Sequence, residues 1–306
     1  MVSVIGDSIL DEYIYGSLIQ KDFPIFKPLN KHYLLGGAGN VVLNIKRMGS
    51  SVAFFSVLGD SEKSDIFKSL LVDKGIFNTF IITDKSRDIC LKTRIVSDNK
   101  VLVRIDNDYT AKLSEQISNQ LYNQLRYNIR ETKVMIISNY YKGCITEELF
   151  IKIKKLCEVN DVKILLDCSK KHDFDGIYLL KPNLAELENM IGRKFDGLND
   201  IIETAMKFKQ YNHIHNMLLT MDKDGLILID EDNNYVKMKS LCTNIVDTCG
   251  AGDTMISAIA LCLANGVDLK SAVQFANYAA AVCCENMGTY AVSLNDIHNF
   301  WSRVNI

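Results

Sequence analysis

The sequence predicts an α/β protein with a doubly wound, mostly parallel β-sheet and helices on both faces. Runs rich in β-branched residues alternate with longer segments of helical period along much of the chain. Strands that alternate with helices form right-handed βαβ units, whose parallel strands are buried on both faces. We expect strands at residues 2–5, 52–58, 134–138 and 162–167, and helices at 39–49, 62–75 and 147–160.

Two segments, residues 12–35 and 88–106, interrupt this alternation. Polar and apolar side chains alternate in both without helical period, and the letters SDNK at 97–100 are typical of a hairpin turn. We expect these insertions to form a small antiparallel β lid over one end of the main sheet. Two of the three prolines fall in the first insertion, where an edge strand or a turn accepts them. No linker or repeat divides the chain, so residues 1–306 are predicted to form a single domain.

The composition favours a globular cytoplasmic protein whose partner is a small molecule. The chain has 306 residues, of which 48% are hydrophobic and 24% charged, so its core should be substantial. A net charge of −2 without a basic cluster gives no footprint for nucleic acid or for an anionic membrane surface. The nine cysteines lack metal-ligand spacing, and neither a signal peptide nor an apolar run of about 20 residues is apparent.

A glycine-bearing turn, DTCGAGDT at residues 247–254, precedes the apolar helical run MISAIALCLA. Such a turn directs several backbone N–H groups to one point, and the helix dipole favours an anion there. Gly250, Ala251 and Gly252 are therefore candidates for a phosphate cradle. Asp253 would repel a bound phosphate, but it is suited to take a proton from a hydroxyl that attacks a phosphoryl group. The alternative is a tight helix entry with Asp253 as an N-terminal cap.

With D-T-x-G-A-G-D complete at residues 247–253, the sequence resembles the ribokinase-like (PfkB) carbohydrate kinases. The early Gly-Gly signature of that family is matched by GGAGNVVLNIKRMG, and its N-x-x-E element by NLAE. The resemblance runs from about residue 2 to residue 301. It implies a ribokinase-like fold and ATP-dependent transfer of a phosphoryl group to an alcohol group of a sugar, with Mg²⁺. Activation by a monovalent cation is common in the family, so K⁺ is a further candidate cofactor.

The resemblance also assigns candidate roles to individual residues. By similarity, Asp253 is the catalytic base and the backbone of 250–253 is the anion hole. The residues in positions where the family holds sugar hydroxyls are Asp11, Gly36, Gly37 and Asn40. A carboxylate and an amide suit vicinal diols because each can engage two hydroxyl groups. The alternatives are a loop aspartate for Asp11 and an ordinary helix-start polar residue for Asn40.

The nucleotide side is assigned in the same way. Asn183 and Glu186 resemble the element that arranges Mg²⁺ and its waters near the triphosphate, with Glu186 acting through water. Locally, an N-cap Asn with Glu three residues later is also a capping pair, and both roles are compatible. Thr220 and Gly225 are expected near the phosphates and the base, and Asn277 on the adenine side. The alternative for Asn277 is a buried polar residue bonded to the backbone.

Within the family, the sequence is most similar to the kinases of D-glycero-β-D-manno-heptose 7-phosphate. The resemblance rests on IGDSILDEYIYG, KTRIVSDNKVLVRID, SNYYKG and PNLAELE. It implies phosphorylation of the anomeric hydroxyl to give the 1,7-bisphosphate, a step toward nucleotide-activated heptose for surface glycans. An acceptor that already carries a phosphate needs cations. The candidates are Lys92, Arg94, Arg104 and Lys142, and the alternative is that these charges are solvated on the lid.

Two departures from the heptose kinase pattern put the acceptor in question. Asn139 stands where those kinases usually have aspartate, and residues 167–174 are one residue longer than the usual pattern. The rivals are a ribokinase-like kinase acting on ribose, fructose or a nucleoside, and a catalytically silent sugar- or nucleotide-binding regulator. An oxidoreductase is disfavoured because GGAGN is not G-x-G-x-x-G. We expect the kinase domain alone, without a fused nucleotidyltransferase, and a homodimer formed through the lid strands.

Overall fold

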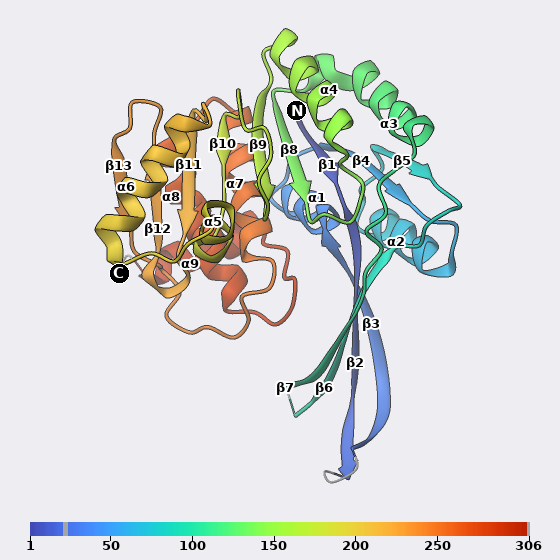
Figure 1. The fold of residues 1–306 in the computed structure, drawn as a ribbon. Coiled ribbons are helices and arrows are strands. Elements are labelled where there is room, and N and C mark those ends of the chain that lie inside the picture. Colours follow the sequence, from blue (N-terminus) through green and yellow to red (C-terminus); the bar gives the residue numbers. More distant parts are fainter. Residues whose placement is uncertain (21–23, 99, 305–306) are drawn as a thin grey trace.

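A nine-stranded, mostly parallel sheet forms the centre of the protein, whose computed structural model describes residues 1–20, 24–98 and 100–304 (Figure 1). In spatial order the strands are β13 (Tyr235–Met238), β12 (Leu226–Ile229), β11 (Asn216–Thr220), β10 (Leu179–Leu180), β9 (Lys163–Cys168), β8 (Val134–Asn139), β1 (Val2–Gly6), β4 (Val52–Leu58) and β5 (Thr79–Thr83). Only the pairings of β11 with β12 and β12 with β13 are antiparallel. The predicted fold class is confirmed.

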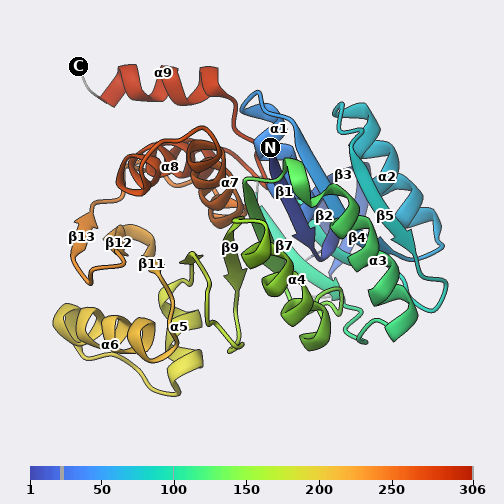
Figure 2. The ribbon, with the colours of Figure 1, turned by 90° about the horizontal axis from the view of Figure 1, so that it is seen from above.

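Helices cover both faces of this sheet (Figure 2). One face carries α1 (Ala38–Arg47), α2 (Glu62–Asp73), α7 (Ala251–Ala264), α8 (Leu269–Cys284) and α9 (Leu294–Val304). The other carries α3 (Glu115–Asn128), α4 (Glu147–Val159), α5 (Leu184–Ile191) and α6 (Gly197–Tyr211). The four strands and three helices expected from the sequence are all present. Within the described part of the chain, no helix combines the length and apolar character needed to cross a bilayer.

The central strands are recognisable from sequence because both of their faces are buried. In β8, Val134 and Ile136 belong to the core under α1, α7 and α8, whereas Met135 and Ile137 belong to the core under α3 and α4. Successive side chains of a strand point to opposite faces, so a doubly covered strand is apolar throughout instead of alternating. This pattern explains why runs of β-branched residues predicted the strands.

The lid is a separate four-stranded sheet that extends away from the α/β body (Figure 1). It consists of β3 (Ile25–Gly37), β2 (Ser8–Gln20), β6 (Cys90–Ser97) and β7 (Lys100–Asn107), in that spatial order. Two antiparallel hairpins, β2–β3 and β6–β7, are joined by a parallel pairing of β2 with β6. Pro28 lies in the edge strand β3, as expected. Residues 21–23 of the first insertion and residue 99 of the predicted SDNK turn lie outside the described residues.

The order of the strands creates a switch point between β1 and β8. From β1 the chain enters the lid and α1 and then reaches β4 and β5 on one side, whereas β8, β9, β10 and β11 follow on the other side. In open α/β sheets, ligands bind outside the carboxyl ends of the strands at such a point. The carboxyl ends of β1 and β8 and the start of α7 therefore define where the site should lie.

Candidate active site

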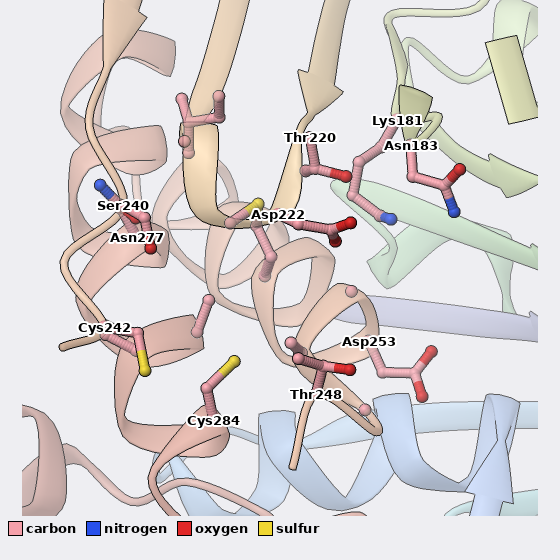
Figure 3. Close-up of a pocket in the computed structure, with 18 of the residues that line it drawn as sticks. Lys181, Asn183, Thr220, Asp222, Ser240, Cys242, Thr248, Asp253, Asn277 and Cys284 are labelled. Carbon is pink, nitrogen blue, oxygen red and sulfur yellow. The ribbon is translucent and has the colours of Figure 1, made fainter. Parts of the chain in front are cut away.

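A cavity of about 360 Å³ lies beside the start of α7 (Figure 3). Every residue predicted for catalysis or for nucleotide binding lines it: Asn183, Glu186, Thr220, Gly225, Gly250, Ala251, Gly252, Asp253 and Asn277. These residues come from α5, β11, the turn before β12, α7 and α8. The fold thus brings together segments that are widely separated in the sequence.

The turn before α7 presents open backbone amides to this cavity. Gly250 has a φ of 82°, a left-handed conformation that favours glycine, and a Cβ there would lie 2.8 Å from Asn40 Nδ2. Within the described residues, the N–H groups of Gly250, Gly252 and Asp253 have no hydrogen-bond partner, while Ala251 N donates to Thr248 O at 3.2 Å. Three of the four expected amides are available to an anion, and Ala251 is the exception.

Asp253 projects its carboxylate away from this turn and does not cap the helix. Oδ1 accepts a hydrogen bond from the Tyr140 hydroxyl at 2.6 Å, and Oδ2 accepts one from Asn40 Nδ2 at 2.8 Å. The side chain is only 5% exposed, and burial raises the pKa of Asp253 to about 7, although both hydrogen bonds favour the ionised form. A carboxyl group that gains and loses its proton near neutral pH is suited to general base catalysis.

A buried ion pair, which sequence reasoning missed, lies at the same end of the cavity. Lys181 Nζ lies 3.0 Å from Asp167 Oδ2. A Cβ on Gly252 would be 3.1 Å from the same Nζ, so the ammonium group lies against the open amides of α7. Figure 3 shows Lys181 and Asp253 at the same end of the cavity, with Lys181 above and Asp253 below. The sequence could have indicated this pair only through the positions of its members. Asp167 and Lys181 stand at the carboxyl ends of the neighbouring strands β9 and β10.

Asn183 and Glu186 form the reciprocal capping box at the start of α5 while also lining the cavity. Asn183 Oδ1 accepts the Glu186 N–H, and Glu186 Oε2 accepts the Asn183 N–H, both at 2.8 Å. Burial, followed by the nearby charge of Asp167, raises the pKa of Glu186. The capping alternative is therefore correct, and it leaves one carboxylate oxygen of Glu186 available to the cavity.

The far end of the cavity is built from glycine and amide positions. Gly225 has a φ of 89°, and a Cβ there would meet Met238 O at 2.1 Å, so this position requires glycine. Asn277 Nδ2 donates to Lys239 O at 2.9 Å, which is the backbone bond foreseen as the alternative for this residue. Asn277 also lines the cavity together with Thr220, so it is in place to contact a ligand.

The residues predicted for the acceptor sugar lie at the base of the lid, on the other side of Asp253. Arg94 Nη1 contacts Asp11 Oδ1 at 2.5 Å, and Arg94 Nη2 lies 3.5 Å from Cys249 Sγ in the turn before α7. A Cβ on Gly36 would lie 2.3 Å from Asp11 Oδ2, which explains the glycine opposite Asp11. The acceptor residues are therefore connected to the catalytic turn by direct contacts.

The remaining predicted cations all have carboxylate partners in this structure. Lys142 contacts Asp108 at 2.5 Å, and Lys92 lies 3.1 Å from Asp106 and 3.8 Å from Asp108. The Arg104 guanidinium forms a two-point contact with Asp106 at 2.7 Å. Lys92 and Lys142 are largely buried, whereas Arg104 is half exposed. The solvated-charge alternative therefore applies in part to Arg104 alone.

The two departures from the heptose kinase pattern meet in space. Asn139 Nδ2 lies 2.9 Å from Nε2 of His172, which belongs to the lengthened segment 167–174. The His172 ring stacks on Tyr141 and Phe150, and Asn139 Oδ1 accepts the Tyr141 N–H at 3.0 Å. The neutral amide thus helps to shape the loop that carries Tyr140.

Comparison with known proteins identifies the family. A model described as pfkB family carbohydrate kinase matches residues 1–296. The chain belongs to this family. It is therefore a carbohydrate kinase, a phosphotransferase with an alcohol group as acceptor, as the sequence resemblance implied.

The curated relatives of this pfkB kinase include bifunctional proteins. The bifunctional protein HldE of Helicobacter pylori (strain Shi470) is 31% identical over 302 residues, covering 97% of this chain and 65% of that protein. The bifunctional protein HldE of Aliarcobacter butzleri (strain RM4018) is 29% identical over 309 residues, covering 99% of this chain and 64% of that protein. The chain therefore spans a little under two thirds of the length of these relatives.

Solved structures share the fold over the whole chain. Phosphofructokinase-2 from Escherichia coli in complex with potassium has a TM-score of 0.84 at 19% identity, covering 100% of this chain and 99% of that chain. Ribokinase from Arabidopsis thaliana complexed with ribose and ATP has a TM-score of 0.78 at 17% identity, covering 98% and 97%. The predicted ribokinase-like fold is confirmed.

Replacing Asp253 with Asn should abolish most of the activity and yet stabilise the fold at alkaline pH. We expect kcat to fall by a factor of about 10² to 10⁴, because the general base is lost. The raised pKa means that the folded state binds the proton more tightly than the unfolded state, so wild-type stability falls as the pH rises from about 4 to 7. Between pH 5.5 and pH 8, the stability of D253N relative to the wild type should therefore rise by about 2 kcal/mol.

Steady-state kinetics and urea unfolding at pH 5.5 and pH 8 test both expectations. Asp65→Asn, at an exposed position of α2, is the matched control and should change neither kcat nor the pH dependence of unfolding. A D253N enzyme with near wild-type kcat would exclude Asp253 as the base.

Proposed function

We propose that this pfkB kinase transfers the γ-phosphoryl group of ATP to the anomeric hydroxyl of D-glycero-β-D-manno-heptose 7-phosphate, giving the 1,7-bisphosphate. The proposal rests on the position of Asp253. It lies between the open backbone amides at the start of α7 and the cationic side chains at the bottom of the lid. The sequence resemblance to heptose kinases supports the choice of acceptor. The curated relatives named HldE share the same stretch of chain.

In this mechanism the acceptor enters from the lid side and its hydroxyl meets Asp253. Asp11 and Asn40 are available to its other hydroxyls, and Asp253 takes the proton as the oxygen attacks phosphorus. The amides of Gly250, Gly252 and Asp253, with the Lys181 ammonium beside them, neutralise the charge that grows on the transferred group. The lid excludes water that would otherwise consume ATP.

The cavity side is proposed to hold the nucleotide, with Thr220, Gly225 and Asn277 around it. Mg²⁺ keeps several waters and needs only one or two protein carboxylates when it binds with phosphates. Glu186 fits that requirement, because one of its oxygens is held by the Asn183 N–H while the carboxylate lines the cavity. Bound there through water, Mg²⁺ would supply charge neutralisation at the triphosphate. K⁺ remains an expected activator to which no step is assigned.

The 7-phosphate is proposed to bind where Lys92, Arg94, Arg104 and Lys142 gather. Their present partners are carboxylates of Asp11, Asp106 and Asp108. A phosphate that carries more charge than a carboxylate can replace Asp108 between Lys92 and Lys142, because those two cations already share it. An unphosphorylated sugar offers nothing in exchange for that ion pair.

A panel of acceptors with coupled detection of ADP tests the proposed substrate. We expect heptose 7-phosphate to be used with a kcat/KM at least about 100-fold above that of ribose, fructose and nucleosides, because only a phosphorylated sugar engages the lid cations. Phosphorylation of unphosphorylated sugars without use of heptose 7-phosphate would replace this assignment by another sugar kinase. Absence of ADP production with every acceptor would favour a silent binding protein.

Replacing Lys142 with Gln should weaken binding of phosphorylated acceptors selectively. We expect KM for heptose 7-phosphate to rise by roughly 10- to 100-fold, the equivalent of one charged hydrogen bond, with little change in KM for ATP. Lys194→Gln, which removes an exposed lysine paired with Glu188, is the matched control. Equal effects on both KM values would place Lys142 outside the acceptor site.

The lid is also proposed to form the interface of a homodimer. Val103 and Ile105 of β7 are about half exposed and share the face opposite Arg104 and Asp106, because side chains alternate along a strand. We expect Val103→Lys to convert a dimer into a monomer in sedimentation velocity experiments, because a buried lysine at the interface would lack a partner. Val159→Lys, at an exposed apolar position on α4, serves as the control. A wild-type monomer at micromolar concentration would contradict the expectation.

A further inference from the structure

The carboxylate of Asp7 is a buried acidic group that the proposed mechanism does not use. Asp7 follows β1 directly, at the switch point of the sheet, and is only 1% exposed. Its Oδ2 accepts the N–H groups of Tyr140 at 2.8 Å and Lys142 at 3.1 Å, and its Oδ1 accepts the Cys144 N–H at 3.0 Å. One side chain thus anchors the loop that follows β8.

The main chain of Asp7 anchors a second element of the site. Its N–H donates to Ser138 O at 3.1 Å, and its carbonyl accepts the Ala38 N–H at 2.9 Å, where α1 begins. A Cβ on Gly37 would lie 2.5 Å from Asp7 O, so the chain passes very close to this carbonyl. Asn40 follows two residues after Ala38, and its position is therefore tied to Asp7 as well.

The two anchored elements supply the two donors to Asp253. Tyr140 heads the loop held by the Asp7 carboxylate, and Asn40 lies in the first turn of α1. Hydrogen bonds to the charged form of a carboxyl group lower its affinity for a proton, so the geometry of both donors controls when Asp253 is ionised. A small displacement of the 140–144 loop would lengthen the 2.6 Å contact between Tyr140 and Asp253.

We propose that Asp7 is a positioning residue that fixes Tyr140 against Asp253 and thereby favours the ionised form of the base. The proposal rests on the role of Asp253 as base in the proposed function. Asp7 does not line the cavity, and its side chain acts through the loop that follows β8.

Other groups around Asp253 do not depend on Asp7 in this way. Charged or titratable side chains face Asp253 from β9, from the segment after β10, from the turn before α7 and from α8: Asp167, Lys181, Cys249 and Cys283. None of the four hydrogen-bonds the Asp7 side chain or main chain within the described residues. A change at Asp7 should therefore reach Asp253 through Tyr140 and α1, and the Tyr140 route can be isolated by mutation.

The test is a double-mutant cycle on the pH dependence of kcat/KM. Wild-type activity should rise with pH around a midpoint near 7, the pKa of Asp253. Tyr140→Phe removes a donor to the ionised base, so the midpoint should move up by about one unit, a tenfold change in proton affinity. Asp7→Asn should move it in the same direction, and Asp7→Asn with Tyr140→Phe should move it no further than Tyr140→Phe alone. Ser138→Ala, at the neighbouring end of β8, is the control and should leave the midpoint in place.

A second measurement does not require activity. The difference in unfolding free energy between each protein and its D253N counterpart, followed from pH 5 to pH 9, reports the proton affinity of Asp253 directly. The pH at which that difference levels off marks the pKa of Asp253 in the folded protein, and it should move upward in Asp7→Asn and in Tyr140→Phe alike. If Asp7→Asn does not fold, Arg87→Met replaces it, because Arg87 Nη2 holds the same loop through Lys142 O at 3.1 Å.

The outcomes separate the two proposals. An unchanged midpoint in Asp7→Asn, or shifts of Asp7→Asn and Tyr140→Phe that add, would overturn the positioning role even if the kinase assignment stands. An active D253N enzyme would overturn the base assignment. An upward shift, in Asp7→Asn, of the pH at which the difference in unfolding free energy levels off would still support the link from Asp7 to Asp253.

Discussion

The burial of one ionisable carboxyl group, Asp253, is the constraint on which the site depends. A carboxylate removed from water is costly unless donors replace the lost solvation, and among the residues that the structure describes only Tyr140 and Asn40 donate hydrogen bonds to it. Because these two hydrogen bonds replace only part of the lost solvation, the pKa of Asp253 rises to about 7. The carboxyl group can therefore gain and lose a proton near neutral pH. A third or fourth donor would stabilise the ionised form further, but it would lower the pKa of Asp253 and make it a weaker base in the proposed function.

The architecture meets this constraint by converging separate elements on one point. The start of α7 contributes Asp253 and its open amides, the start of α1 contributes Asn40, and the carboxyl ends of β8 and β10 lead to Tyr140 and Lys181. These elements meet because parallel strands align their carboxyl ends and the helices that follow return to the same edge. The lid grows from the end of β1, and Asp7 at that point holds both the start of α1 and the loop that follows β8.

Sequence reasoning recovered the parts of this arrangement that are local. The buried strands, the turn at Gly250 and the Asn183–Glu186 capping box each leave a pattern within a few residues. Asp253 was a candidate base because an acid in a phosphate cradle is chemically unusual, and the resemblance of D-T-x-G-A-G-D to the ribokinase-like signature then favoured that role over a helix cap. Tyr140 and Lys181 could not, since the contact of Tyr140 with Asp253 spans 113 residues and any tyrosine or lysine in a loop would have been an equal candidate. The parallel pairing of β2 with β6 was hidden for the same reason, because it is a contact between two insertions.

The cost of burying a charge also explains the ion pairs at the base of the lid. Whereas the buried Asp253 has a raised pKa, the buried lysines here are paired with carboxylates. Lys92 and Lys142 are largely buried, and a buried cation without a partner would destabilise the ligand-free protein. Asp106 and Asp108 remove that cost by standing where an acceptor phosphate would be bound in the proposed function. Binding then exchanges one anion for another, so affinity depends on the extra charge and the additional oxygens of the phosphate. A neutral hydroxyl cannot make that exchange, so in the proposed function an unphosphorylated sugar leaves the ion pairs of Lys92 and Lys142 intact and gains no affinity from these cations.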